Sequence, residues 1–158
     1  MANSLDIFSL TNPAFCSLVL LSFCEGYTEE AGSEVPYVFL MFPLPLVLSG
    51  DLQSSFDNTS IRTGFYGWVR SNPQILVNLS ERIEYSNDFT KPAIAYSFSR
   101  NVLKLNSNGT ITPLNENVGK YTQTKNVNVY FKNAKRLGGW LGQIKSPKTI
   151  FNHLGLQA

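Results

Sequence analysis

Residues 1–61 contain no lysine or arginine, and residues 117–158 contain no aspartate or glutamate. Seven acids lie in the first of these segments and seven bases in the second, although the formal net charge of the whole chain is only +2. Such a separation is informative about partners more than about the fold. The basic part suits an acidic protein surface or a phosphate backbone. Alternatively, it is merely solvated, or the two oppositely charged parts pack against each other.

Residues that build reaction centres are also scarce. His153 is the only histidine, and we expect it to serve in packing or capping. A metal site needs several His, Cys or carboxylate ligands at short spacing, and a Ser/His or Cys/His pair needs a suitably placed base. The adjacent acids Glu29 and Glu30 are expected in a solvated loop. We therefore expect no enzyme activity, no catalytic residue, no metal and no cofactor.

The two cysteines, Cys16 and Cys24, lie eight residues apart on one predicted helix. Their Cα atoms would be about 12 Å apart, which is too far for a disulfide. Buried thiols in a reducing compartment are expected instead. The apolar run 14–24 lacks a basic flank and is too short to span a bilayer, so no signal peptide is evident. These features together favour a cytoplasmic protein.

Charged residues make up only 15% of the 158 residues, whereas 43% are apolar and 13% aromatic. This length predicts one domain. A free monomer usually exposes more charge, so the composition favours a partner that covers part of the surface. The alternative is that the abundant Asn, Ser and Thr residues keep the chain soluble.

Proline and asparagine divide the first two-thirds of the chain into helices. Asn12 and Pro13 predict a helix start. The segment 14–27 is apolar nearly all round, which is typical of a central buried helix. A helix from Val35 should break at the prolines of 43–45, although a buried strand over 37–42 is the alternative. Further helices are predicted over 60–70, after Asn72–Pro73, and from Thr90 with Pro92.

The final third contains a hairpin and two basic helices. The turn 106–109 between short apolar runs predicts a β-hairpin over 102–113, placed like the wing of a winged-helix unit. A polar linker, 115–124, leads to a helix over 125–144 with a clean apolar stripe. Its pair Gly138–Gly139 costs about 1 kcal/mol per glycine, which indicates that another backbone packs closely there. A last helix, 148–154, should follow Ser146–Pro147 and end at Gly155.

The sequence therefore predicts a mainly α (α+β) fold: one compact multi-helix domain, 1–158, with one β-hairpin and a possible winged-helix likeness. We divide it into a helical part (12–103), the hairpin (102–113) and the basic C-terminal helices (125–155). The bases of the hairpin and of the last helices are the candidate contacts to a partner or to a DNA backbone. They are Lys104, Lys125, Lys132, Lys135, Arg136, Lys145 and Lys148.

Several motifs, in order along nearly the whole chain, carry a family resemblance. They are Thr11-Asn12-Pro13-Ala14, Glu25-Gly26-Tyr27, the run 44–48, the segment 134–141 and the segment 146–155. Together they resemble the middle component of three-component bacterial systems built around an SMC/Rad50-like ABC ATPase.

The resemblance implies an accessory subunit similar to that of Lamassu-type systems, which act in antiviral (phage) and plasmid defence. It implies protein–protein interaction with the ABC ATPase subunit and with an effector subunit such as a nuclease. DNA is an expected partner only through the complex, and no membrane is implied. The alternative from the residues alone is a winged-helix DNA-binding protein or regulator.

Overall fold

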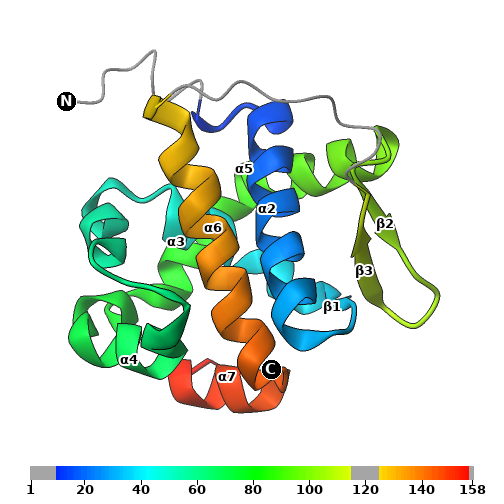
Figure 1. Cartoon of the computed structure of the whole chain (residues 1–158). Coiled ribbons are helices and arrows are strands. Elements are labelled where there is room, and N and C mark those ends of the chain that lie inside the picture. Colours follow the sequence, from blue (N-terminus) through cyan, green and yellow to red (C-terminus); the bar gives the residue numbers. More distant parts are fainter. Residues whose placement is uncertain (1–9, 115–124, 157–158) are drawn as a thin grey trace.

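The computed structural model describes residues 10–114 and 125–156. Two long helices, α2 (Pro13–Ala31) and α6 (Lys125–Ile144), lie side by side at the centre, and the other elements surround them (Figure 1). The two helices run in the same direction, because Phe15 contacts Phe131 near their starts and Tyr27 lies against Gly142 near their ends. The expectation of a mainly α fold is confirmed.

The start of α2 follows from its first residues. The Asn12 side chain accepts hydrogen bonds from the N–H groups of Ala14 (2.8 Å) and Phe15 (3.3 Å). Pro13 occupies the first helical position, where no N–H is needed. Most of the helix is buried, so the prediction of a central helix is confirmed.

The end of α2 lies about one turn later than predicted. Gly32, with φ of 69°, ends the helix and donates its N–H to the Thr28 carbonyl oxygen at 3.0 Å. Glu29 and Glu30 are therefore in the last turn of a helix, and the prediction of a loop there is wrong. A glycine in the left-handed conformation is the usual helix stop, and the acids before it do not interrupt the helix.

Glycines bring the backbones of α2 and α6 into contact along what we call the glycine seam: Gly26, Gly138 and Gly142. A Cβ atom at Gly26 would collide with the Lys135 carbonyl, and one at Gly138 with the Phe23 carbonyl. A Cβ at Gly142 would lie 2.6 Å from a carbonyl oxygen of α2. The prediction of a closely packed backbone at the glycine pair of α6 is confirmed.

The segment after α2 is helical but begins with a strand. Val35–Pro36 form β1, followed by the 3-10 helix η1 (Tyr37–Met41), α3 (Pro43–Val47) and the 3-10 helix η2 (Gly50–Phe56). The predicted break at Pro43 is confirmed, but the helix start at Val35 is wrong. β1 lies at a sheet edge, where a proline without an N–H is tolerated.

The region 60–99 differs most from the prediction. Ser60 caps a 3-10 turn, η3 (Ile61–Thr63), before α4 (Gly64–Ser71), and Pro73 opens only another 3-10 turn, η4 (Pro73–Leu76). The two helices expected after Asn72 and from Thr90 are a single helix, α5 (Leu79–Ser99), with Pro92 inside it.

The continuity of α5 has a packing reason. One stripe of buried residues recurs every three or four positions on both sides of the proline, so tertiary packing outweighs the local preference to break. The buried residues near Pro92 are Ala93 and Ser97, and Ile94 and Phe98 are partly buried against the core. The members of the stripe are Leu79, Ile83, Ser86, Thr90, Ala93 and Ser97.

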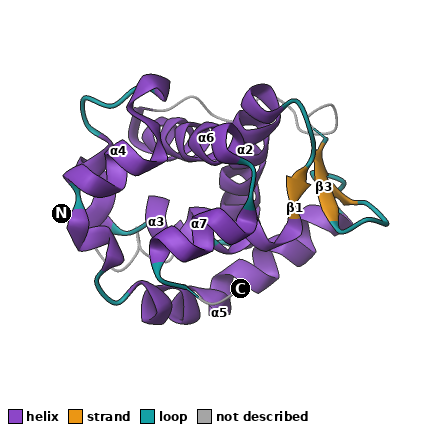
Figure 2. Cartoon of the chain, turned by 90° about the horizontal axis from the view of Figure 1, so that it is seen from below, coloured by secondary structure: helices purple, strands orange, loops and turns teal. Residues whose placement is uncertain are grey.

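The predicted hairpin is confirmed as β2 (Leu103–Leu105) and β3 (Thr110–Pro113). It forms part of a three-stranded antiparallel sheet in the order β1-β3-β2, in which Ile111 lies opposite both Val35 and Leu105. The polar linker predicted over 115–124 lies outside the described residues. Figures 1 and 2 show α2 between α6 and this sheet.

The last helix, α7 (Pro147–Leu154), covers one end of the molecule (Figure 2). Ser146 accepts a hydrogen bond from the Thr149 N–H at 3.2 Å, and Gly155 ends the helix with φ of 73°. Both predicted boundary signals are confirmed.

The described residues contain no single helix that meets the length and hydropathy needed to cross a membrane, and one pair bent by 99°, Tyr37–Val47 with Gly50–Phe56, meets them together.

Candidate partner-binding site

The seven predicted bases do not form one surface. Lys132, Lys135 and Arg136 share the middle of α6, whereas Lys104 lies on β2, across α2 from them (Figure 1). Lys145 and Lys148 are exposed where α6 ends and α7 begins. Lys125 starts α6, but its side chain lies outside the described residues. The structure therefore brings together three of the seven bases.

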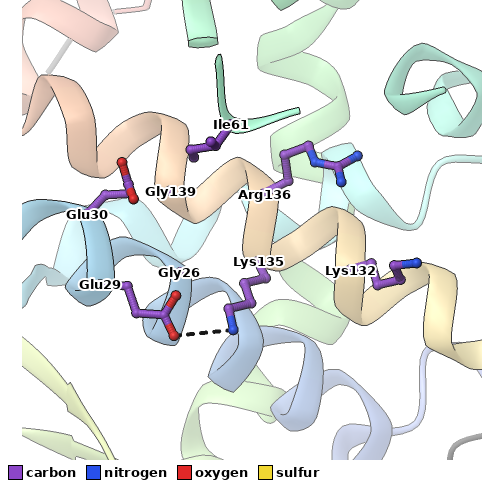
Figure 3. A pocket seen from close by; sticks show the side chains of 8 residues that line it. All are labelled: Gly26, Glu29, Glu30, Ile61, Lys132, Lys135, Arg136 and Gly139. Atoms are coloured by element: carbon purple, nitrogen blue, oxygen red, sulfur yellow. Dashed lines mark ion pairs between the residues drawn. The ribbon is translucent and has the colours of Figure 1, made fainter. Parts of the chain in front are cut away.

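These three bases line a groove between α2 and α6 with a volume of about 410 Å³ (Figure 3). Because the glycine seam holds the two backbones in contact, the long side chains beside it stand along the rim. We call this site the α2–α6 groove. Its lining residues are Gly26, Glu29, Glu30, Ile61, Lys132, Lys135, Arg136 and Gly139.

Opposite charges meet at one end of the α2–α6 groove. The Lys135 Nζ lies 3.2 Å from Glu29 Oε1, and both side chains are more than half exposed. In Figure 3, Lys135 points toward Glu29, whereas Lys132 and Arg136 point away from it. The acidic first part of the chain thus pairs with the basic last part here. The predicted packing of the two parts against each other applies to Lys135.

The acids of the α2–α6 groove stand at an unfavourable position on their own helix. Carboxylates in the last turn of α2 face the negative end of the helix dipole. Lys135 offsets this for Glu29, and Gln143 donates from Nε2 to Glu30 Oε1 at 3.2 Å. Helix α6 therefore stabilises the acidic end of α2, which fixes these carboxylates at the groove.

A second hollow, of about 400 Å³, lies beside Lys132 and Arg136. Arg136 donates from Nη1 to Thr59 Oγ1 at 3.1 Å. Across the described part of the chain, no carboxylate lies within 4.0 Å of Lys132 or Arg136. We call this hollow the α6 cleft. One wall comprises Phe56, Asp57 and Asn58, and the other Asn128, Val129, Lys132, Asn133 and Arg136.

Asn133 is the unusual member of the α6 cleft. The residue is only 5% exposed, and its buried Nδ2 atom has no hydrogen-bond acceptor among the residues that the structure describes. A buried amide donor without a partner lowers stability by about 1–3 kcal/mol. Such an exception in a folded protein calls for an explanation. One explanation is a ligand that accepts a hydrogen bond from this amide.

An aromatic cluster holds the segment 56–61, which includes the wall at Phe56–Asn58, against α6. The Trp140 Nε1 donates to the Ser60 carbonyl oxygen at 3.0 Å, and the Trp140 ring is parallel to that of Phe56, with centroids 6.0 Å apart. The Trp68 Nε1 donates to Ser55 Oγ at 3.1 Å. Both indoles are fully buried with their donors satisfied, so the wall of the α6 cleft is fixed to the helix that carries its bases.

A comparison with protein families now identifies the chain. The model of the family described as ABC-three component (ABC-3C) system Middle Component 3 matches residues 5–158. The chain belongs to this family. No curated protein and no solved structure gives a significant match to this middle component.

Other reactive groups of the middle component have structural surroundings. Cys16 and Cys24 are free and buried, as predicted, and burial raises the pKa of the Cys16 thiol to about 12. Burial also raises the pKa of Cys24 far above its ordinary value. The His153 ring packs against that of Tyr66, with centroids 4.5 Å apart. The described ranges 10–114 and 125–156 contain no group of three or more metal-ligating residues.

The site contains members that were not predicted from the sequence: Asn133, Glu29, Glu30 and the segment 56–61. One signal was available for Asn133. It lies four positions before Leu137 and three after Tyr130, and is therefore a polar residue on the apolar stripe of α6. No local pattern indicates that the segment 56–61 lies against this helix, because that contact depends on the tertiary fold.

Proposed function

We propose that this middle component is the accessory subunit that joins an SMC/Rad50-like ABC ATPase to an effector, such as a nuclease. The system is proposed to act in bacterial defence against phage or plasmids, in the manner of Lamassu. Membership of the family of ABC-three component middle components supports a role as a subunit of such a system. The motifs that resemble Lamassu-type accessory subunits support the link between ATPase and effector and the role in defence.

The observation that carries the proposal is the face around Lys132 and Arg136. Two hollows adjoin on α6, and the charges at them are of both signs. The glycine seam and the aromatic cluster hold this face on a buried core. Complementary charges on a rigid face favour selective recognition of another protein more than they add to raw affinity.

Contact with a DNA backbone is the alternative that this geometry favours less. A phosphate backbone requires several bases along one face. Here α2 separates Lys104 of the hairpin from the bases of α6, and Glu29 pairs with Lys135. The exposed carboxylates of the α2–α6 groove would repel phosphates brought close to Lys132.

We further propose that the subunit contributes no catalytic step and acts in the cytoplasm. The buried thiols with raised pKa values are poor nucleophiles at neutral pH, which supports the first point. His153→Ala is the sharpest check, because this residue is the only histidine. The assembled system should keep its activity in this variant.

Co-purification tests the proposal. The chain is expressed with the ATPase and effector encoded beside it, with an affinity tag on the ATPase alone. We expect the three proteins to elute together from a size-exclusion column, and we expect omission of the middle component to separate effector from ATPase. A middle component that elutes alone as a monomer would refute the proposal.

A further inference from the structure

We infer that the α6 cleft binds a carboxylate from an acidic segment of a partner subunit, with Lys132, Arg136 and Asn133 as the donors. The inference rests on the proposed function, because it names the chemistry by which the middle component would hold its partner. It concerns the α6 cleft and not the α2–α6 groove, where Lys135 already has a carboxylate.

The charges at the α6 cleft are available to a ligand. Lys132 and Arg136 are one helical turn apart, so both side chains stand on the same side of α6. Within the described residues, neither has a carboxylate partner, whereas their neighbour Lys135 does. The bond to Thr59 orients the Arg136 guanidinium and uses one of its five N–H donors. An arginine held in this way is suited to bidentate recognition of a carboxylate.

Asn133 adds the independent observation. It lines the cleft, the residue is only 5% exposed, and its buried amide nitrogen lacks an acceptor in the ranges described. The χ2 torsion of asparagine is soft, so the amide can turn toward an oxygen that enters the cleft. A carboxylate has two oxygens, which allows it to accept from the guanidinium and from the amide together.

The surroundings favour a single carboxylate over a nucleic-acid backbone. Asp57 lies on the opposite wall of the α6 cleft, and Glu29 and Glu30 lie at the adjoining groove. A duplex carries a dense row of phosphates, several of which would come close to these acids. One acidic side chain on a protein segment can enter beside Lys132 without that repulsion. The acidic protein segment is therefore the occupant that we infer.

A titration of the ¹⁵N-labelled full chain, followed by NMR, tests the inference without any partner. The probe is a capped hexapeptide of glycine and serine with one central glutamate, and a 12-base-pair DNA duplex serves as the second probe. We expect the Asn133 side-chain amide signal and the backbone amides of 132–136 to shift with the peptide and to saturate. The duplex should shift these signals less at the same ionic strength.

The variants separate the cleft from net charge. Lys132→Glu combined with Arg136→Gln should weaken peptide binding at least tenfold, whereas Lys148→Glu on α7 should change it less than threefold. Lys132 is exposed, so Lys132→Glu alone remains usable if the double variant does not fold. Asn133→Leu should weaken peptide binding several-fold without lowering the midpoint of urea unfolding, which a purely structural role would not produce.

The outcomes decide between the inference and the proposed function. Loss of peptide binding only in the cleft variants supports the inference. An unshifted Asn133 signal, or equal weakening by Lys148→Glu, overturns it. Stronger and saturable binding of the duplex at the same signals also overturns it, in favour of nucleic acid. Each of these results leaves co-purification with the ATPase intact, whereas failure of co-purification removes the proposed function itself.

Discussion

Helices α6 and α5 both pack against α2, but they do so by different means. At α6 the contact is between backbones, since Gly26, Gly138 and Gly142 leave no room for a Cβ atom. At α5 the buried stripe consists largely of Ser86, Thr90 and other small side chains. The α2–α6 contact therefore has one permitted geometry, whereas the α5 contact has side chains that can adjust.

The polar side chains in the buried stripe of α5 form their hydrogen bonds within α5 itself. The hydroxyls of Ser86 and Ser97 donate to carbonyl oxygens of α5 itself, each at 2.8 Å. Outside this stripe, Arg82 forms a two-bonded ion pair with Asp51 at the surface. The site lies on α6 and not on α5. The candidate binding face is thus carried by the helix whose contact with α2 allows less movement than the contact of α5.

Gly138→Ala, at the contact between α2 and α6, should produce the largest change in the free energy of unfolding. The added methyl group would collide with the Phe23 carbonyl, and backbone cannot move aside as a flexible side chain can. We expect the free energy of unfolding to fall by about 3 kcal/mol, measured by urea unfolding followed by circular dichroism.

Gly50→Ala is the matched control, because a Cβ atom there meets nothing within 4 Å. This change should stay within about 0.5 kcal/mol of the wild type. Equal stability of the two variants would show that α2 and α6 can separate at little cost, which would remove the proposed basis for the rigidity of the site.

Pro92→Ala tests helix α5, whose contact with α2 can adjust, and should stabilise the folded chain. Pro92 is exposed inside α5 and has no N–H to donate to the Asp88 carbonyl. Alanine is about 3 kcal/mol more favourable in a helix interior, less about 1 kcal/mol for the greater freedom of the unfolded chain. We expect a gain of about 2 kcal/mol in the free energy of unfolding, measured by urea unfolding.

Lys91→Ala, at the exposed neighbouring position, is the control for Pro92→Ala and should change stability by less than about 0.5 kcal/mol. A loss of stability in Pro92→Ala would contradict the expectation. It would mean that the packing of α5 against α2 depends on a bend that the proline introduces.

Local signals predicted the parts of the fold that local chemistry determines. Asn12 with Pro13, Ser146 with Pro147, and Gly155 each specify a helix end through their own hydrogen bonds or φ angles. Pro92 is the counterexample. Its local preference predicts a helix boundary, but the buried stripe of α5 continues across it. The stripe is stabilised by contacts with other elements, and a short window of sequence does not contain those partners.

The candidate site was predictable in one half only. Lys132 and Arg136 stand out as bases of a helix without acids, and their shared face follows from helical spacing. The cleft they line also needs the wall at Asp57, more than seventy residues earlier in the chain. That wall is positioned by Trp140 and Phe56, whose contact is tertiary. The paired state of Lys135 depends in the same way on the seam that aligns α2 with α6.

The ion pair between Asp51 and Arg82 should have the smallest effect on the free energy of unfolding, and this effect depends on pH. The two Arg82 nitrogens lie 3.0 Å from the two Asp51 oxygens, and the Arg82 hydrogen bond holds the pKa of Asp51 below its ordinary value of 3.8. A carboxyl with a depressed pKa stabilises the folded state above its ordinary pKa. This contribution is lost as the pH falls through the lowered value. Because Asp51 is largely exposed, we expect less than about 1 kcal/mol.

Urea unfolding at a series of pH values measures this effect. Asp51→Asn should be less stable than the wild type at pH 7, and the difference should shrink as the pH falls below 3.8 and as salt is added. In Arg82→Gln, the same Asp51→Asn change should produce no such pH dependence, because the guanidinium whose hydrogen bond and charge depress the pKa is gone. A pH-dependent difference that survives in Arg82→Gln would place its cause outside the ion pair. The buried stripe of α5 would then hold this helix in place without help from the ion pair, and α5 and α6 would differ only in the size of the groups that they pack against α2.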